Sequence, residues 1–292
     1  MYGNLLVPMD GSPLAEIALP YVYQLLARFE PKVTFLHVCR EGDQSRFMCE
    51  AYVNRLAETV EQQTKAKKGR VSAVTVSGHV ADGILEQARK TGSDMILMAA
   101  HGHSGPNRIL GSTVHKVLAA AKTPVLVVRE ELPKGSEGWP KDVIVPLDGS
   151  SLSETVLPHV IALAKTGVNV TLLRVCEPPV VLADYPDSVM PDNWEEHVKL
   201  AQKGAEKTCN IYLHDIAKDK LAREGVEANS RVVLADGAAN GIIEDVGRFP
   251  SALIVMSTHG RSGFSRWPYG HVADRILLAS ENPILLVRPQ KP

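Results

Sequence analysis

The sequence predicts an α/β protein of two tandem domains, each a five-stranded parallel sheet with helices on both faces. Three observations support this prediction. Short apolar segments alternate with amphipathic ones along the chain, which is the pattern of strands joined by crossover helices. The motifs of the first half return in the same order in the second half. The length of 292 residues fits two domains of roughly 150 residues each.

An internal repeat divides the chain into two similar halves. The segment 10–20 returns as 148–158, and the His-Gly pair at 101–102 returns at 259–260. The spacing between copies is larger for the second pair than for the first, so we place an insertion in the second half, at 178–194. A repeat this long indicates a duplicated domain, because solenoid units span only about 20–50 residues.

Hydrophobic periodicity sets the elements of the first half. Asp-Gly-Ser at 10–12 turns the chain from an apolar strand into a helix. The segment 51–68 is polar with spaced apolar residues, as in an amphipathic helix, whereas 94–99 is apolar throughout, as in a buried strand. In order, we predict strands at 4–8, 32–39, 71–77, 94–99 and 124–129, and helices at 14–28, 51–68, 81–90 and 111–121.

The second half repeats this alternation. We predict strands at 143–146, 169–175, 226–233, 252–257 and 284–288, and helices at 152–165, 195–223, 241–247 and 270–279. In parallel sheets, ligands bind beyond the carboxyl ends of the strands, where the strand order reverses. The loops after the first and fourth strands of each half leave that edge, so both repeated motifs are expected to face one crevice.

The domain boundaries follow from composition. Residues 133–139 are rich in proline, glycine and serine, so we predict domains at 1–132 and 140–292 with a linker at about 133–139. The closing segments 124–129 and 283–288 are apolar and lie at sheet edges, which favours pairing. We expect them to pair with each other as an internal pseudo-dimer, and we leave homodimerisation open.

Composition excludes several partners. The net charge of −1 gives no general attraction to nucleic acid or to an anionic membrane, and no apolar stretch approaches the ~18–20 residues of a membrane helix. The amino terminus lacks a signal-peptide pattern, and four cysteines without a CxxC pair suit a reducing, cytoplasmic setting. Cys39 and Cys176 occupy similar positions, so we interpret them as buried apolar residues, with redox sensing as the alternative. No metal site is expected.

A glycine-rich loop follows the fourth strand in each half. Gly102 and Gly260 allow main-chain N–H groups to approach a phosphate without a Cβ in the way. Gly111 and Gly270 precede helices, whose positive amino-terminal ends favour an anion. The alternative is that these glycines only make turns and that Ser112 only caps its helix.

These motifs resemble those of the universal stress protein family in its tandem form. The resemblance rests on Val-Pro-x-Asp-Gly-Ser after the first strand, His-Gly-x-Ser-Gly after the fourth and Pro-Val-Leu-Val-Val at the end, and it covers nearly the whole chain. It implies Rossmann-like domains of the adenine nucleotide alpha hydrolase type and a role in stress response or regulation. It also implies ATP or a related adenine nucleotide, with or without Mg, in one or both domains, either of which can be empty.

Neither half matches the glycine pattern of the ATP-binding members, which is Gly, two residues, Gly, nine residues, then Gly with Ser or Thr. In the first half Ala99 replaces the first glycine, and the segment before Gly111 is one residue short. The second half keeps the spacing, but Ser257 replaces the first glycine and His271 replaces the hydroxyl residue. We therefore expect a more typical site in the first half and an altered one in the second.

By this resemblance, the nucleotide-binding residues come from the loops after the first, second and fourth strands and from the next helix start. In the first half they are Pro8, Met9, Asp10, Val38, Met98, Ala99, His101, Gly102, Gly105, Arg108, Gly111, Ser112 and Thr113. In the second half they are Pro146, Leu147, Asp148, Val175, Met256, Ser257, His259, Gly260, Gly263, Arg266, Gly270, His271 and Val272.

Several of these residues have a structural alternative. The aspartates and the serines after them can cap a helix, and the two valines can be plain core residues. His101 and His259 could serve as general acids or bases, but no carboxylate stands at a defined spacing, so a loop-stabilising role is favoured. No P-loop or nucleophile elbow occurs. We therefore predict no catalytic residues and a nucleotide-binding regulator with an unknown protein partner. The alternatives are an interaction module with degenerate sites and a slow adenine-nucleotide hydrolase.

Overall fold

The computed structural model of the chain describes residues 1–40, 46–64, 66–102, 110–130, 139–177, 194–259 and 269–289. The strands of the first half are β1 (Asn4–Pro8), β2 (Lys32–Cys39), β3 (Val71–Ser77), β4 (Met95–Ala99) and β5 (Val125–Val128). Those of the second half are β6 (Asp142–Pro146), β7 (Asn169–Cys176), β8 (Ala228–Leu234), β9 (Leu253–Ser257) and β10 (Ile284–Val287).

The helices alternate with these strands. In the first half they are α1 (Pro13–Glu16), α2 (Leu19–Phe29), α3 (Arg46–Thr64), α4 (Val80–Lys90) and α5 (Ser112–Ala120). The second half has η1 (Ser153–Val156), α6 (Leu157–Ala164), α7 (Trp194–Ile216), η3 (Ala217–Leu221), η4 (Ala222–Glu224), α8 (Ala238–Val246) and α9 (His271–Ala279). None of these described helices is long and apolar enough to cross a membrane.

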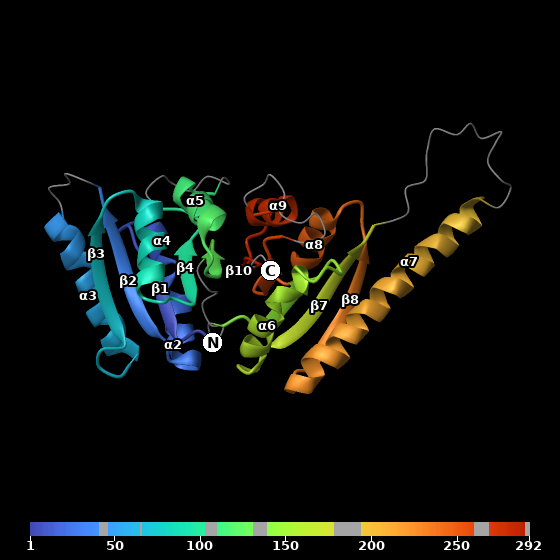
Figure 1. Ribbon diagram of the computed structural model, residues 1–292, viewed down its shortest axis with the longest axis horizontal. Helices are drawn as coiled ribbons and strands as arrows, with labels where there is room; N and C mark the ends of the chain where they lie inside the picture. Colours follow the sequence, from blue (N-terminus) through green and yellow to red (C-terminus); the bar gives the residue numbers. More distant parts are fainter. Residues whose placement is uncertain are drawn as a thin grey trace.

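All ten described strands join one sheet, in the order β3-β2-β1-β4-β5-β10-β9-β6-β7-β8. Pairing is parallel within each half, and the single antiparallel pair among the described strands is β5 with β10. Figure 1 shows the two halves on either side of that pair, with α7 extending past β8. The predicted α/β class and the two five-stranded parallel sheets are confirmed.

The helix predicted at 14–28 is divided into α1 and α2. Pro20 lies in the first turn of α2, and a proline has no N–H to continue the hydrogen-bond ladder of the preceding helix. The second half repeats this division, because Pro158 lies in the first turn of α6 and separates it from η1. The expectation of one continuous helix at each place was wrong, although the prolines were visible in the sequence.

Three further helices differ at their ends from the prediction, and one of them, α8, begins at Ala238 rather than at residue 241. α3 begins at Arg46 rather than at residue 51, so it carries an additional turn at its amino-terminal end. α7 ends at Ile216, and the chain continues through a π-helical turn and a 3₁₀ turn to Glu224. Cys49 lies in the additional first turn of α3.

Helices cover both faces of the sheet, and each face has its own apolar core. On one face, α2, α3, α6 and α7 pack on alternate strand residues that include Val33, Phe35, Val170 and Leu172. On the other face, α4, α5, α8 and α9 pack on the intervening residues, such as Leu36. A side-chain period of two along each strand produces this division.

The β5–β10 pair joins the two halves into one sheet. Leu126 lies opposite Leu285, with Val125 opposite Leu286 on one side of that pair. Every residue of both strands is buried. The expected pairing of the two closing strands is therefore present, and it leaves neither edge open to solvent.

Two arginines cross this seam reciprocally. Arg129, just after β5, donates a hydrogen bond to the carbonyl oxygen of Leu277 in the last turn of α9. Arg288, just after β10, donates to the carbonyl oxygen of Ala119 in the last turn of α5. The last carbonyl groups of a helix lack partners within it and carry partial negative charge, so a guanidinium there is favourable. Each half thus caps a helix of the other half.

An aromatic cluster also joins the halves, on the face of the sheet that α2 and α6 cover. The ring of Tyr2 meets that of Phe29 at 5.2 Å between centroids, and Phe29 meets Trp139 at 6.4 Å. The Tyr2 hydroxyl is 2.9 Å from Nδ1 of His159 in α6. Burial lowers the pKa of His159 to about 4, an effect that Asp94 opposes and the amino terminus reinforces. This histidine is therefore neutral at pH 7.

Replacing Arg288 with methionine is expected to lower the free energy of unfolding by about 1.5–3 kcal/mol, because the bond from a charged donor to the Ala119 carbonyl is lost. Arg129→Met should behave alike. Urea unfolding measures the change. Arg223→Met is the control, since that exposed side chain makes only an i,i+4 pair, and its effect should stay within about 0.5 kcal/mol. Equal effects at Arg288 and Arg223 would contradict the capping role.

Candidate functional site

A cavity of about 610 Å³ opens at the carboxyl edge of the first-half strands. It is lined by the ends of β1, β2 and β4 and by the start of α5, as the strand-order rule requires. Every predicted first-half residue that the structure describes lies in its wall. These residues are Pro8, Met9, Asp10, Val38, Met98, Ala99, His101, Gly102, Gly111, Ser112 and Thr113.

The aspartate after the first strand of each half builds a turn. Asp10 Oδ1 accepts hydrogen bonds from the Ser12 amide at 2.9 Å and from the Ser12 hydroxyl at 2.6 Å. Ser12 Oγ in turn accepts from the Ala15 amide at 3.1 Å and so caps α1. Asp148 and Ser150 repeat both bonds at the same distances. Ser12 is therefore a helix cap, as the structural alternative predicted, whereas Ser150 Oγ accepts from the Ser153 amide at 3.1 Å and η1 begins only after Leu152.

Gly102 lies against the other oxygen of the Asp10 carboxylate. A Cβ at position 102 would overlap Oδ2 of Asp10, so any larger residue must displace that carboxylate. Among the described residues, the amides of His101 and Gly102 donate to no protein group. A Cβ at this point is therefore accommodated only if the Asp10 carboxylate moves, and with glycine the main chain beside it can serve a ligand.

The start of α5 faces the same cavity. Ser112, Thr113 and Val114 form its first turn, and the amides of a first helical turn have no partner within the helix. No described side chain caps this end. The Gly111 amide, in contrast, already donates to the Ala100 carbonyl oxygen at 3.0 Å. The cradle that remains for an anion is the first turn of α5 together with the main chain at Gly102.

His101 also lines this cavity. Burial lowers the pKa of His101, and the positive charge of Arg129 lowers it further, so the imidazole is neutral at pH 7. No carboxylate among the described residues hydrogen-bonds to its ring. The arrangement lacks the orienting acid of a general-base histidine, which favours the loop-stabilising interpretation.

The second half has a matching cavity of about 600 Å³. It lies at the carboxyl edge of β6, β7 and β9 and at the start of α9. Every predicted second-half residue that the structure describes lines it. These residues are Pro146, Leu147, Asp148, Val175, Met256, Ser257, His259, Gly270, His271 and Val272. Neither cavity is filled by side chains.

The polar groups of the second loop form hydrogen bonds within the loop itself. Ser257 Oγ donates to the His259 carbonyl oxygen at 2.7 Å and accepts from the His259 amide at 3.3 Å. The Thr258 hydroxyl lies 2.9 Å from Nδ1 of the same histidine. Ala99, the residue at the position of Ser257 in the first half, has no hydroxyl with which to make such bonds. The second site therefore offers fewer main-chain donors to a ligand.

The glycines before α5 and α9 are under different constraints. Gly270 has φ of +80°, and a Cβ there would overlap the main-chain oxygen of Thr258. Gly111 has φ of −59°, and its Cβ would lie 3.2 Å from the Ala100 oxygen, which is tight but tolerable. Glycine is therefore obligatory in the second loop and only preferred in the first.

Sequence analysis missed an arginine in the wall of the second cavity. Arg174 is 8% exposed, donates from Nε to Cys209 Sγ at 3.2 Å, and stacks on the Tyr212 ring at 4.9 Å. Its Nη1 has no hydrogen-bond partner among the described residues. His37 holds the corresponding place in the first half. An alignment of the two halves on Cys39 and Cys176 would have pointed to both His37 and Arg174.

Five predicted site residues lie outside the described part of the chain. They are Gly105, Arg108, Gly260, Gly263 and Arg266. The proposed insertion at 178–194 and the linker at 133–139 lie outside it as well, except for Trp194 and Trp139.

Two cavities of similar volume thus lie at equivalent places on a duplicated α/β fold. A model of the universal stress protein family matches residues 1–129 and again residues 140–288. The chain therefore belongs to the universal stress protein family, and the resemblance inferred from the motifs is confirmed.

Individual relatives agree with this assignment. A universal stress protein of Mycolicibacterium smegmatis is 24% identical over 307 residues, which covers 99% of this chain and 98% of that protein. Universal stress protein YxiE of Bacillus subtilis is 28% identical over 148 residues and matches 44% of this chain with its whole length. The crystal structure of a universal stress protein from Archaeoglobus fulgidus shares the fold, with a TM-score of 0.68, 16% identity and coverage of 99% and 97%.

Gly270→Ala is expected to destabilise the protein more than Gly111→Ala does, by ~1–3 kcal/mol, because only position 270 requires the left-handed conformation. The two variants are matched, since each adds one methyl group before the corresponding helix. Thermal unfolding monitored by circular dichroism measures the difference. Similar melting temperatures for the two variants would contradict the constraint at Gly270.

Proposed function

We propose that the first domain binds ATP or a related adenine nucleotide in the 610 Å³ cavity. The observation that carries the proposal is the first turn of α5, which lines the cavity beside Gly102 and whose amides have no partner within the helix and no described side chain capping them. The volume lies within the roughly 300–1,000 Å³ typical of small-molecule sites. Family membership supports the choice of an adenine nucleotide over another anion.

The walls of the first cavity suit the two ends of such a ligand. The phosphates would lie against Ser112 and Thr113, where amides and hydroxyl groups donate and the helix dipole is favourable. Val38 and Met98 offer apolar contact for a base, and the Asp10 carboxylate also lines the cavity. Any Mg²⁺ that accompanies the nucleotide would find oxygen donors in Asp10 and in the phosphates themselves.

The second domain is proposed to bind nucleotide more weakly. Its His259 amide is engaged by Ser257, and His271 replaces the hydroxyl residue at the helix start. Arg174 adds a buried cation that the first cavity lacks at that place. This cavity therefore retains room for an anionic ligand but presents it with a different set of donors.

A regulatory role fits the chemistry of the first cavity better than turnover does. The described residues of its wall include no lysine that could clamp a transferring phosphoryl group. Ligand binding at the start of α5 would instead order the adjacent loop, and the far end of α5 is held by Arg288 of the other domain. A ligand in the first cavity would thus also affect the second domain, on the other side of the β5–β10 pair.

Titration calorimetry of the full chain with ATP is expected to show saturable binding at one dominant site. Gly102→Ala should weaken that binding strongly, because the added methyl group displaces the Asp10 carboxylate from its place in the wall. The cradle of a phosphate or ribose group would then be filled by protein atoms.

Gly204→Ala is the control variant, since Gly204 lies in α7 with open space around its Cβ position, and it should bind as the parent does. Mass spectrometry of gently purified protein provides a second readout, with co-purified nucleotide expected. An absence of saturable binding below millimolar ATP, or equal affinity in Gly102→Ala, would exclude the proposal and favour an interaction module with degenerate sites.

A further inference from the structure

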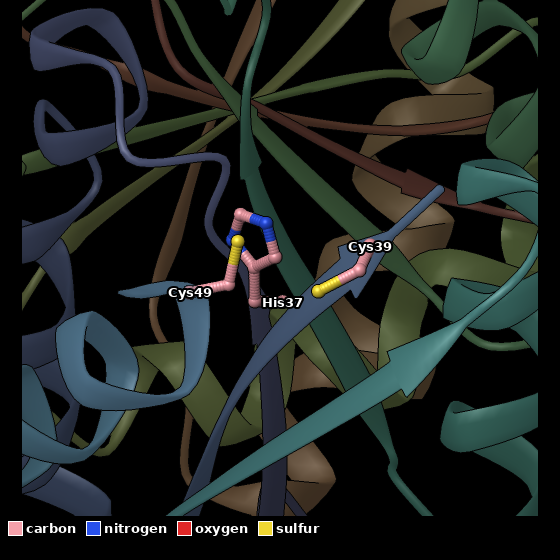
Figure 2. Close-up of side chains that lie close together, drawn as sticks. All are labelled: His37, Cys39 and Cys49. Carbon is pink, nitrogen blue, oxygen red and sulfur yellow. The ribbon is translucent and has the colours of Figure 1, made fainter. Parts of the chain in front are cut away.

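Three potential metal ligands meet on one wall of the first cavity. They are His37, Cys39 and Cys49, and their ligand atoms all lie within 4.8 Å of one another. Figure 2 shows the imidazole of His37 and the two sulfur atoms gathered at the end of β2, with Cys49 coming from α3. All three residues line the first cavity.

The fold produces this cluster in two steps. Alternate residues of β2 face the same helix layer, so Val33 and Phe35 enter the core under α3 while His37 and Cys39 follow on the same face near the strand end. The additional first turn of α3 then places Cys49 over that strand end. His37 and Cys39 lie two residues apart on one strand, whereas Cys49 comes from the next helix, and together they match no short zinc spacing motif.

The cluster includes a buried polar atom without a partner among the described residues. His37 Nδ1 is buried and has no hydrogen-bond partner among the described residues, and the same holds for Thr75 Oγ1. Thr75 lies beside His37 in the β2–β3 register. Buried polar groups normally have partners, and leaving one without costs roughly 1–3 kcal/mol. A bound cation would use the imidazole nitrogen that the protein leaves unsatisfied.

We propose that His37, Cys39 and Cys49 bind one Zn²⁺ in the first domain. An imidazole with two thiolates is a ligand set that zinc prefers, with three protein ligands and a fourth position open to water or substrate. Zn–S bonds of about 2.3 Å and Zn–N bonds of about 2.0–2.1 Å place tetrahedral ligand atoms roughly 3.5–3.8 Å apart. The observed limit of 4.8 Å requires a contraction of about 1 Å, which rotation of the half-buried Cys49 can supply.

The second domain provides the contrasting case within the same chain. Cys176 ends β7 as Cys39 ends β2, and Cys209 of α7 interacts with it as a neighbouring thiol. The residue at the place of His37 is Arg174, whose guanidinium already donates to Cys209 Sγ. A guanidinium has no lone pair for a metal and repels a cation. The proposal therefore predicts one zinc ion per chain, bound in the first domain only.

The test uses the reduced full chain without nucleotide, so its outcome is independent of ATP binding. After equilibration with Zn²⁺ and a competing chelator, elemental analysis is expected to find one zinc per chain. Titration with Co²⁺ should give the intense near-ultraviolet absorption of thiolate-to-cobalt charge transfer, a signal that non-specific surface binding does not produce.

His37→Arg, which copies the second domain, and Cys49→Ser should each abolish both signals. Cys209→Ser is the matched control and should retain them. Circular dichroism of each variant checks that it is folded, and the cobalt spectrum of the parent protein tests the site without any substitution. Absence of stoichiometric metal in the parent, retention in Cys49→Ser, or equal loss in Cys209→Ser would overturn the proposal, as would a Cys39–Cys49 disulfide that persists in the reduced protein.

Discussion

The antiparallel pair of β5 and β10 is the constraint on which the rest of the molecule depends. It makes one sheet from two halves, and it fixes both α5 and α9 beside the seam. Arg129 and Arg288 then hold the carboxyl end of the helix in the opposite half, and Tyr269, just before the second helix, shares a hydrogen bond with His115 of α5. Each helix that starts at one cavity, α5 and α9, therefore has its carboxyl end held by an arginine of the other half.

The two halves share the same backbone arrangement but differ in the side chains that line their cavities. The two Asp-Gly-Ser turns make the same hydrogen bonds at the same distances. The two cavities have nearly the same volume, 610 and 600 Å³. Substitutions at a few equivalent places then separate the sites: Ala99 against Ser257, Ser112 against His271 and His37 against Arg174. The first cavity keeps its main-chain donors and gains a soft-metal ligand set, whereas the second engages its own amide and gains a buried cation.

Much of the fold could be predicted because its signals are local. Alternating apolar segments predicted the strands and the parallel sheet of each half, and every described residue chosen by family resemblance lines a cavity. The features that escaped depend on contacts between distant segments. Cys49 meets His37 only because α3 starts early and folds back over β2, and Arg288 reaches Ala119 only because the closing strands pair. The signal for the division of the first helix, Pro20, was local in the sequence. The apolar periodicity around it nevertheless led to the prediction of one continuous helix.

The most direct test of this account is a crystal structure of the full chain grown with a non-hydrolysable ATP analogue. The account predicts the phosphates against the first turn of α5, with Ser112 and Thr113 as donors, and the base beside Val38 in the first cavity. An empty first cavity at saturating analogue, or an analogue bound with its phosphates away from α5, would contradict it.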